Sequence, residues 1–199
     1  MDKIICIGKN YLEHAKELGD AVPKDPVVFL KPPSVSLSVL SEKEKVRVKL
    51  PQGRGMIHYE CEIILKLNAR AEIEAVSLGL DLTLRDLQSE LKKKGLPWEA
   101  AKVFSGSAII GPWIPVAQFL NYFDAPFQFS LDGKVVQRAR GREMRFSPQE
   151  CIEYIHSLFP ICQGDVLFTG TPAGVGPVCP GQQGDLRWGE ILQFGVEFE

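Results

Sequence analysis

Residues 56–65 read Met-Ile-His-Tyr-Glu-Cys-Glu-Ile-Ile-Leu, a stretch that predicts a β-strand ending in an apolar run. Because successive side chains of a strand point to opposite faces, His58, Glu60 and Glu62 would share one face. Two carboxylates at this spacing repel each other, and a bound divalent cation commonly offsets this repulsion. Mg²⁺, Mn²⁺ and Ca²⁺ are hard cations that prefer oxygen ligands. A solvated polar face on a half-buried strand explains the same alternation. The stretch alone leaves both interpretations open.

The segments on either side of this stretch are short and separated by turn residues. The 199 residues include 14 prolines and 18 glycines. Many of the segments between them are rich in β-branched or aromatic residues, which is typical of strands and turns. With 45% hydrophobic residues and no repeat or low-complexity linker, the chain can form one sizeable core. We therefore expect a single β-rich α+β domain over residues 1–199.

Two of three predicted helices lie in the first half of the chain. One covers Tyr11 to Leu18 and stops at Gly19. The other has Thr83 as its N-cap and Asp86 three residues later, and it ends in a run of lysines before Gly95. Charges at both of its ends complement the helix dipole.

The third predicted helix begins at a capping box. Ser147 and Glu150 are three residues apart, with Pro148 at the first helical position. We expect an apolar face made of Cys151, Ile152, Ile155 and Leu158.

Asp81 is the next candidate for chemistry, because it lies where an apolar run meets the predicted helix start. A strand end at this point would deliver its carboxylate to a site, although a turn or capping Asp is the alternative. Arg85 and Gln88 are three residues apart and share a helix face, so either could address a substrate oxygen beside Asp81.

His14 and Glu17 have the same i, i+3 spacing on the first helix, so the carboxylate could hold the imidazole as a general base. An exposed ion pair is the alternative. Lys102 lies between Trp98 and Phe104. Its ammonium could polarise a carbonyl, or its stem could cover the aromatic side chains.

Residues 164–177 predict a strand followed by a glycine-rich loop, which could hold a carboxylate through its backbone amides and the hydroxyl of Thr171. The loop lacks the Lys and Ser/Thr ending of a P-loop, and the sequence contains no GxGxxG, so nucleotide binding is not supported. The absence of a GxSxG motif weakens a serine-hydrolase interpretation.

Charge and cysteine content limit the partners and the cellular location that we expect for the protein. The chain has 23 Lys and Arg against 25 Asp and Glu, a formal net charge of -2, so no strong field would recruit nucleic acid or an anionic membrane. Its apolar stretches are shorter than the ~20 residues of a membrane span, and the N-terminus does not resemble a secretory signal. Five cysteines without a CxxC pair favour reduced thiols. We expect a cytoplasmic protein that binds neither nucleic acid nor a membrane.

These segments occur in one order, and together they resemble the fumarylacetoacetate hydrolase family, in its small acylpyruvase and oxaloacetate decarboxylase branch. The resemblance covers nearly the whole chain. The motifs that carry it are Gly8-Lys9-Asn10-Tyr11 with His14 and Glu17, Phe29-Leu30-Lys31-Pro32, His58-Tyr59-Glu60-Cys61-Glu62, residues 79–86, Pro97-Trp98 with Lys102, and Thr169-Gly170-Thr171-Pro172.

The resemblance implies a fold, an assembly and a set of site residues. Mixed β-sheets would roll into a sandwich-like barrel, assembled as a homodimer, with residues 1–30 as a candidate lid. The implied metal ligands for Mg²⁺ or Mn²⁺ are Glu60, Glu62 and Asp81. The implied catalytic residues are His14, Glu17 and Lys102, and the implied substrate contacts are Lys9, Tyr11, Lys31, Arg85, Gln88 and Thr171.

The leading functional hypothesis from this resemblance is an acylpyruvase-like hydrolase that cleaves a C–C bond of a 2,4-dioxo acid, giving pyruvate and a carboxylic acid. A cation chelated by the 2-oxo acid would stabilise the enolate that leaves. The alternatives are an oxaloacetate decarboxylase or tautomerase and a 2-hydroxyhepta-2,4-diene-1,7-dioate isomerase. A catalytically silent metal-binding homodimer is the alternative of another class.

Two departures from the family pattern bear on these expectations. The family has a longer stretch with a helix between its second and third metal ligands, whereas only residues 63–80 separate Glu62 from Asp81 here. Either this member is shortened or residues are missing, and the cost of removing a helix beneath a metal site favours missing residues. Lys9 stands where some relatives carry Arg, which alters how a substrate carboxylate would be held.

Overall fold

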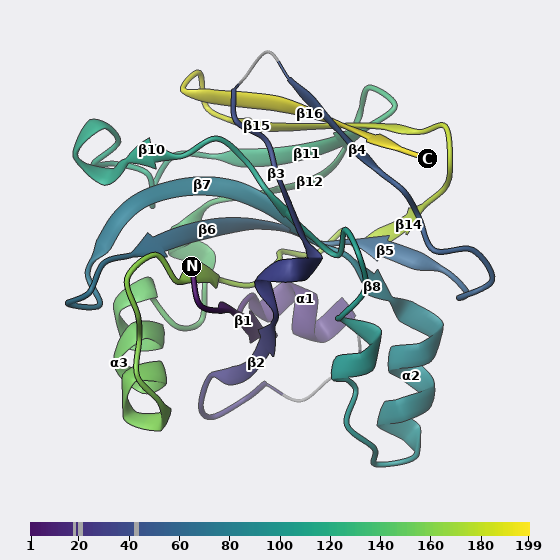
Figure 1. The fold of residues 1–199 in the computed structure, drawn as a ribbon, viewed down its shortest axis with the longest axis horizontal. Coiled ribbons are helices and arrows are strands. Elements are labelled where there is room, and N and C mark those ends of the chain that lie inside the picture. The colour runs from purple at the N-terminus through teal and green to yellow at the C-terminus, as the bar shows by residue number, and fades with distance from the viewer. Residues whose placement is uncertain (18, 20–21, 42–43) are drawn as a thin grey trace.

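Curved β-sheets make up most of the structure, a computed structural model that describes residues 1–17, 19, 22–41 and 44–199 (Figure 1). The largest sheet is mixed and has the strand order β2-β1-β13-β6-β7-β9-β3, with β10 paired to β7. Its strands are β1 (Ile4–Gly8), β2 (Val27–Lys31), β3 (Ser36–Ser38), β6 (Cys61–Leu67), β7 (Ile73–Asp81), β9 (Ala108–Ile110), β10 (Ile114–Pro115) and β13 (Val166–Phe168).

A second sheet stacks on the first and has the order β12-β11-β15-β16-β4 (Figure 1). Its strands are β4 (Lys45–Val48), β11 (Phe127–Leu131), β12 (Lys134–Ala139), β15 (Gln183–Trp188) and β16 (Leu192–Phe198). A small third sheet is formed by β14 (Gly176–Val178), β5 (Ile57–Tyr59) and β8 (Thr83–Leu84). These curled, mixed sheets confirm the predicted β-rich sandwich.

Strand alternation explains how the two large sheets share one core. In β6, Ile63 and Leu65 belong to the main core together with Phe129 and Phe194 of the second sheet. Ile64, between them, belongs to a smaller cluster on the opposite face. Each fully buried side chain of this size contributes about 1.5–3 kcal/mol, so the largest sheet is stabilised from both sides.

The predicted third helix is confirmed. The described residues contain α1 (Leu12–Glu17), α2 (Arg85–Lys93) and α3 (Pro148–Leu158), none of them long and apolar enough to cross a membrane. At the start of α3 the Ser147 hydroxyl accepts from the Glu150 N–H at 3.3 Å, and Glu150 accepts from the Ser147 N–H at 2.8 Å. Leu158 is 54% exposed, so the predicted apolar face ends one turn earlier, at Ile155.

The first two helices depart from the predicted boundaries. Helix α1 begins at Leu12, because Tyr11 forms a β-bridge with Met144, and its expected end at Leu18 lies outside the described residues. Thr83 does not cap α2: it lies in β8, and its hydroxyl donates to Glu60 Oε1 at 3.1 Å. Short 3₁₀ turns complete the helical content at Pro33–Val35, Glu99–Ala101, Val116–Gln118 and Gly141–Glu143.

The predicted strand over residues 56–65 is interrupted. It divides into β5 and β6 on either side of Glu60, and β5 pairs with β14 and β8 instead of joining the largest sheet. His58 is consequently separated from the face that carries Glu62.

Strands β6 and β7 form a closed antiparallel hairpin. A tight turn joins them, in which the Asn68 N–H donates to Glu72 O at 2.9 Å and the Ala71 N–H to Asn68 O at 3.0 Å. The expectation of missing residues between Glu62 and Asp81 is therefore wrong, and the chain is shortened at this point.

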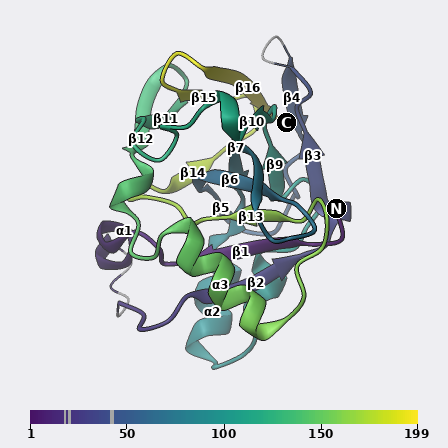
Figure 2. The same ribbon diagram turned by 90° about the vertical axis from the view of Figure 1, so that its left-hand side faces the viewer.

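The N-terminal segment contains structural strands as well as a surface helix. Strand β1 lies between β2 and β13 in the largest sheet (Figure 2), and Ile4 and Ile5 are fully buried. A lid drawn from residues 1–30 can therefore comprise only the connection between β1 and β2, which carries α1.

Candidate active site

Three carboxylates meet at the end of the β6–β7 hairpin. Glu60, Glu62 and Asp81 are buried, and each offers an oxygen atom within 4.8 Å of the others. Antiparallel pairing sets Glu62 opposite Gly79, and the Asp81 N–H donates to Glu60 O at 2.9 Å. The structure thus brings together the three predicted metal ligands.

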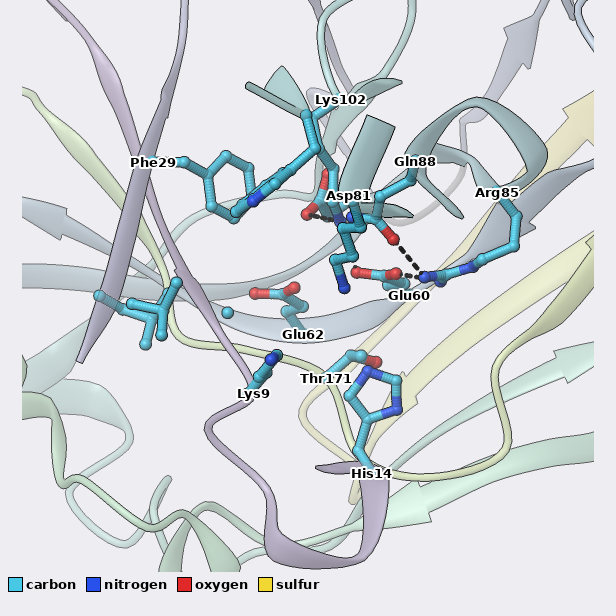
Figure 3. A pocket seen from close by; sticks show the side chains of 15 residues that line it. Lys9, His14, Phe29, Glu60, Glu62, Asp81, Arg85, Gln88, Lys102 and Thr171 are labelled. Carbon is cyan, nitrogen blue, oxygen red and sulfur yellow. Dashed lines mark hydrogen bonds and ion pairs between the residues drawn. The ribbon is translucent and has the colours of Figure 1, made fainter. Parts of the chain in front are cut away.

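Cationic side chains surround this trio (Figure 3). The Lys102 ammonium lies 2.7 Å from Glu60 Oε2 and 2.7 Å from Asp81 Oδ2. Arg85 donates to Glu60 Oε1. On the side away from the pocket, the Lys31 ammonium lies 2.5 Å from Asp81 Oδ1. Within the described residues, Asp81 Oδ1 still accepts no hydrogen bond of good geometry.

The pKa values of Glu60 and Glu62 are shifted in opposite directions. Burial opposes ionisation of Glu60, but Lys102 and Arg85 outweigh it and hold the pKa of that carboxyl well below its usual range. Burial lowers the pKa of Lys102, but its contacts with Asp81 and Glu60 outweigh this effect and raise it. Burial, together with the neighbouring charges of Asp81 and Glu60, raises the pKa of Glu62 well above its usual value. The neutral form of the Glu62 carboxyl is therefore favoured in the absence of a cation, whose positive charge would favour ionisation.

The donor set fits a hard divalent cation. Three carboxylates converge, and their mutual repulsion is the kind that a cation removes. Glu60, Glu62 and Asp81 would hold Mg²⁺ or Mn²⁺. In Glu62 the carboxylate also accepts from the Gly170 N–H at 2.6 Å, which orients it toward the site.

The predicted His–Glu pair is present at the pocket wall. His14 is 4% exposed, and its Nδ1 lies 3.2 Å from Glu17 Oε2. Glu17 also accepts from the Gly174 N–H at 3.1 and 3.2 Å, so the glycine-rich loop fixes the carboxylate that orients the imidazole. Figure 3 shows His14 and Lys9 on the opposite side of the pocket from Lys102.

Helix α2 presents a polar stripe to the pocket. Arg85 and Gln88 share a face as predicted, and Arg85 donates to Gln88 Oε1 at 2.7 Å. Lys92 lines the pocket one turn farther along, a residue missed from the sequence although its spacing of seven from Arg85 marks the same face. Including its open mouth, the pocket encloses about 580 Å³, a volume within the usual range for small-molecule sites.

Two of the predicted substrate contacts lie outside the lining of the pocket. Lys31 does not line the pocket: its ammonium lies beneath Asp81 and donates to Ser107 O at 2.8 Å. Tyr11 is buried and its phenol donates to Arg140 O at 3.4 Å, away from the pocket. Both side chains stabilise the surroundings of the site.

Thr171 lines the pocket as predicted, and its hydroxyl has partners within the protein. Its hydroxyl donates to Cys61 O at 2.9 Å and accepts from Gln137 Nε2 at 2.8 Å. A hydroxyl has one proton, and in this structure that of Thr171 is donated to Cys61 O. Gln137 was missed by sequence reasoning, since nothing in β12 marks it as a residue that reaches the site.

Asn10 is a second missed residue, although it belongs to a quoted motif. It is fully buried, and its side-chain amide donates to Phe146 O at 3.0 Å and Thr169 O at 2.8 Å. Its Oδ1 accepts from the Phe146 N–H at 2.8 Å. Asn10 thus ties the end of β1 to the glycine-rich loop and to the start of α3.

The arrangement is that of an enzyme active site, because a metal-competent trio and a buried imidazole face one open pocket. The chain belongs to the fumarylacetoacetate hydrolase family: residues 3–198 match the family described as "Fumarylacetoacetate (FAA) hydrolase C-terminal".

Two of the similar proteins are named as oxaloacetate tautomerases. The chain is 37% identical over 208 residues to oxaloacetate tautomerase FAHD1, mitochondrial, of Arabidopsis thaliana, covering 98% of this chain and 91% of that protein. It is 34% identical over 194 residues to oxaloacetate tautomerase YcgM of Escherichia coli, covering 92% and 86%. Because one relative is mitochondrial, the cytoplasmic location stays a prediction.

A solved structure with the same fold is fumarylpyruvate hydrolase from Pseudomonas aeruginosa in complex with Mn²⁺ and pyruvate. The TM-score is 0.91 at 30% sequence identity, covering 98% of this chain and 88% of that one.

Proposed function

We propose that the chain is an oxaloacetate tautomerase, which interconverts the keto and enol forms of this 2-oxo dicarboxylic acid. Oxaloacetate tautomerases of Arabidopsis and Escherichia coli are among its relatives at 37% and 34% identity. They support the oxaloacetate alternative better than the leading expectation of an acylpyruvate hydrolase. The observation that carries the proposal is the His14 imidazole, oriented by Glu17 across the pocket from the carboxylate trio.

Tautomerisation moves one proton between C3 and the oxygen on C2. A divalent cation held by Glu60, Glu62 and Asp81 would supply a Lewis acid that stabilises negative charge on the oxygens of the 2-oxo acid. With Nδ1–H donated to Glu17, His14 Nε2 carries the lone pair that accepts the C3 proton. Returning this proton to the C2 oxygen completes the enol.

Lys102 and Gln88 bind and orient the substrate in this scheme. The Lys102 ammonium is positively charged beside the trio and donates to oxygen as charge develops there. Hydrolysis of a 2,4-dioxo acid would need a placed water in addition, and decarboxylation would need no base. The His14–Glu17 pair therefore matches proton transfer better than decarboxylation.

Mn²⁺ occurs with pyruvate in the fumarylpyruvate hydrolase structure, and we propose Mg²⁺ or Mn²⁺ for this chain. A homodimer is proposed as the assembly, which sedimentation velocity at micromolar concentration tests. Neither nucleic acid nor a membrane is proposed as a partner.

Three assays on metal-stripped protein reloaded with Mg²⁺ or Mn²⁺ separate the candidate reactions. Ketonisation of enol-oxaloacetate is followed by coupling to malate dehydrogenase, decarboxylation by coupling to lactate dehydrogenase, and acetylpyruvate cleavage by loss of substrate absorbance. We expect metal-dependent ketonisation that is lost in His14→Asn and Glu62→Gln. Pyruvate formation that survives in His14→Asn would support the decarboxylase, and acetylpyruvate cleavage without ketonisation would support the hydrolase. No turnover of any substrate would support the silent scaffold.

A further inference from the structure

Gln137 is a buried polar side chain that the proposed reaction does not use. It lies on β12, an edge strand of the second sheet, and is 1% exposed (Figure 1). Its amide oxygen accepts from the Cys61 N–H at 2.9 Å, and its amide nitrogen donates to Thr171 Oγ1 at 2.8 Å and to Pro172 O at 2.9 Å. A peptide N–H can only donate and a peptide oxygen can only accept, so these partners fix the orientation of the amide.

The partners of Gln137 form a closed ring of hydrogen bonds around the peptide groups of Cys61, which stands between two carboxylates of the trio. The pairing of β13 with β6 ends at Ile64, short of this residue. The hydroxyl of Thr171, which accepts from Gln137, donates to Cys61 O at 2.9 Å. Because buried peptide groups need partners, the two side chains do here what a neighbouring strand would do. They fix the backbone between the metal ligands.

The glycine-rich loop connects this ring to both halves of the active site. It donates through the Gly170 N–H to Glu62 at 2.6 Å and through the Gly174 N–H to Glu17 at 3.1 and 3.2 Å. Gly174 has φ +96°, and an added Cβ would clash with Val136 O. The loop therefore packs directly on the backbone of β12. One strand of the second sheet thus supports a metal ligand and the carboxylate that orients the imidazole.

We propose that Gln137 is a positioning residue that makes the geometry of the carboxylate trio and the orientation of His14 depend on each other. The inference rests on the proposed function, in which both groups act on one substrate. Without the amide, the Cys61 peptide and the glycine-rich loop would be released together. The metal ligands and Glu17 would then lose their fixed positions at the same time.

Metal affinity tests the trio side of this coupling. Gln137→Met retains much of the side-chain volume and removes the amide. Its Kd for Mn²⁺, measured by calorimetry on metal-stripped protein, should rise about 10- to 100-fold, the usual effect of losing a residue that orients metal ligands. Ser77→Ala is the matched control, because Ser77 is fully buried in β7 and donates to Pro112 O at 2.8 Å, away from the loop. It should lower the unfolding temperature and leave the Kd unchanged.

Nuclear magnetic resonance of ¹⁵N-labelled histidine tests the imidazole side without turnover. The chain has three histidines, and the signals of His14 are identified by their loss in His14→Asn. In the metal-free and Mg²⁺-loaded proteins, His14 should carry its proton on Nδ1, donated to Glu17. Gln137→Met should show a mixture of the two neutral tautomers, whereas Ser77→Ala should keep the single one.

Kinetics tests whether the same coupling serves the reaction. At saturating Mg²⁺, Gln137→Met should lower kcat for ketonisation with little change in KM. Because Gln137 acts through Glu17, adding Gln137→Met to Glu17→Gln should lower kcat by less than the product of the two single effects.

A second pair of variants breaks the ring from the loop side and decides the question if Gln137→Met does not fold. Thr171→Val removes the hydroxyl that donates to Cys61 O, and Thr171→Ser retains it. Thr171→Val should weaken Mn²⁺ binding and mix the His14 tautomers, and Thr171→Ser should restore both properties.

A destabilised Gln137→Met protein with unchanged Mn²⁺ affinity and one His14 tautomer would overturn the proposal, as would a change in only one of these two properties. Equal changes in Ser77→Ala would also overturn it. If both properties depend on Gln137 but enol-oxaloacetate is not ketonised, the positioning role stands and the proposed function fails. If ketonisation occurs and Gln137→Met leaves kcat unchanged, the proposed function stands and the positioning role fails.

Discussion

Replacing Lys31 by Met tests whether this lysine is a structural counter-charge for the active site. Its side chain is 0% exposed, and the ammonium lies 2.5 Å from Asp81 Oδ1, itself on a side chain that is 1% exposed. It also donates to the carbonyl oxygens of Ser107 at 2.8 Å and Leu82 at 3.4 Å. Met retains much of the volume of Lys but removes the charge and these hydrogen bonds.

The expected loss is large because the buried Asp81 carboxylate would keep only Lys102, which it shares with Glu60, as a counter-charge. Removing one partner of a buried ion pair costs about 3–5 kcal/mol. For a chain of this length each kcal/mol lowers the melting temperature by roughly 2–4 °C, so Lys31→Met should melt roughly 6–20 °C below the unmodified protein. Urea unfolding of the metal-free proteins measures the free energy directly.

Lys66→Met is the matched control. Lys66 pairs with Glu74 at 2.9 Å on the surface, where the two side chains are 34% and 39% exposed. An exposed pair of this kind contributes about 0–1 kcal/mol. Saturating Mn²⁺ should reduce the loss in Lys31→Met, since the cation supplies positive charge to Asp81, and it should not change the effect of Lys66→Met.

A double variant distinguishes the loss of a counter-charge from a simple packing defect in Lys31→Met. Adding Asp81→Asn to Lys31→Met removes the carboxylate charge that Lys31 offsets, so the double variant should be less destabilised than the sum of the two single changes. Additive losses, or a loss below about 1 kcal/mol in Lys31→Met, would refute the counter-charge role.

Three further predictions concern the surroundings of the trio. Because the folded-state pKa of Glu62 is raised, the metal-free protein should lose stability as the pH rises from the unfolded pKa of about 4.3 toward the folded pKa. The increase in melting temperature on adding Mn²⁺ should therefore grow with pH. Calorimetry of Mn²⁺ binding in buffers of different ionisation enthalpy should show that protons are released. Gln137→Met leaves the buried Cys61 N–H without its acceptor and should cost about 1–3 kcal/mol in urea unfolding. Glu17→Gln should lower kcat for ketonisation roughly 10- to 100-fold with little change in KM, because a neutral amide stabilises the imidazolium less well; Glu13→Gln on the same helix is the control.

Local patterns predicted the parts of the fold and site that depend on neighbours in the chain. The capping box at Ser147 is complete within four residues, and both of its hydrogen bonds are present. The i, i+3 spacing of His14 and Glu17 likewise predicted their contact. Asp81 was found because a strand ends there.

The errors arise where a distant partner competes with a local one. Thr83 has the local signature of an N-cap, but its hydroxyl donates to Glu60, 23 residues away in sequence. Lys31 follows Phe29 and Leu30 on an edge strand, and the motif does not reveal whether its ammonium points into the pocket or beneath Asp81. Gln137 reaches the site from the second sheet, which only the tertiary packing reveals.

The register of the β6–β7 hairpin explains how the positions of the metal-ligand side chains are kept independent of the turn. Side chains of a strand alternate, so a slip of one residue in the β6–β7 pairing would turn Glu62 to the other face. The pairing is regular from Cys61↔Leu80 to Lys66↔Ala75, and its one irregularity lies between Lys66 and Leu67, next to the turn. A register shift at this position is confined to the turn end of the hairpin. The ligand end therefore keeps its register, and further changes confined to residues 68–72 should leave metal binding intact, whereas deletion of one residue between Ile63 and Leu65 should abolish it.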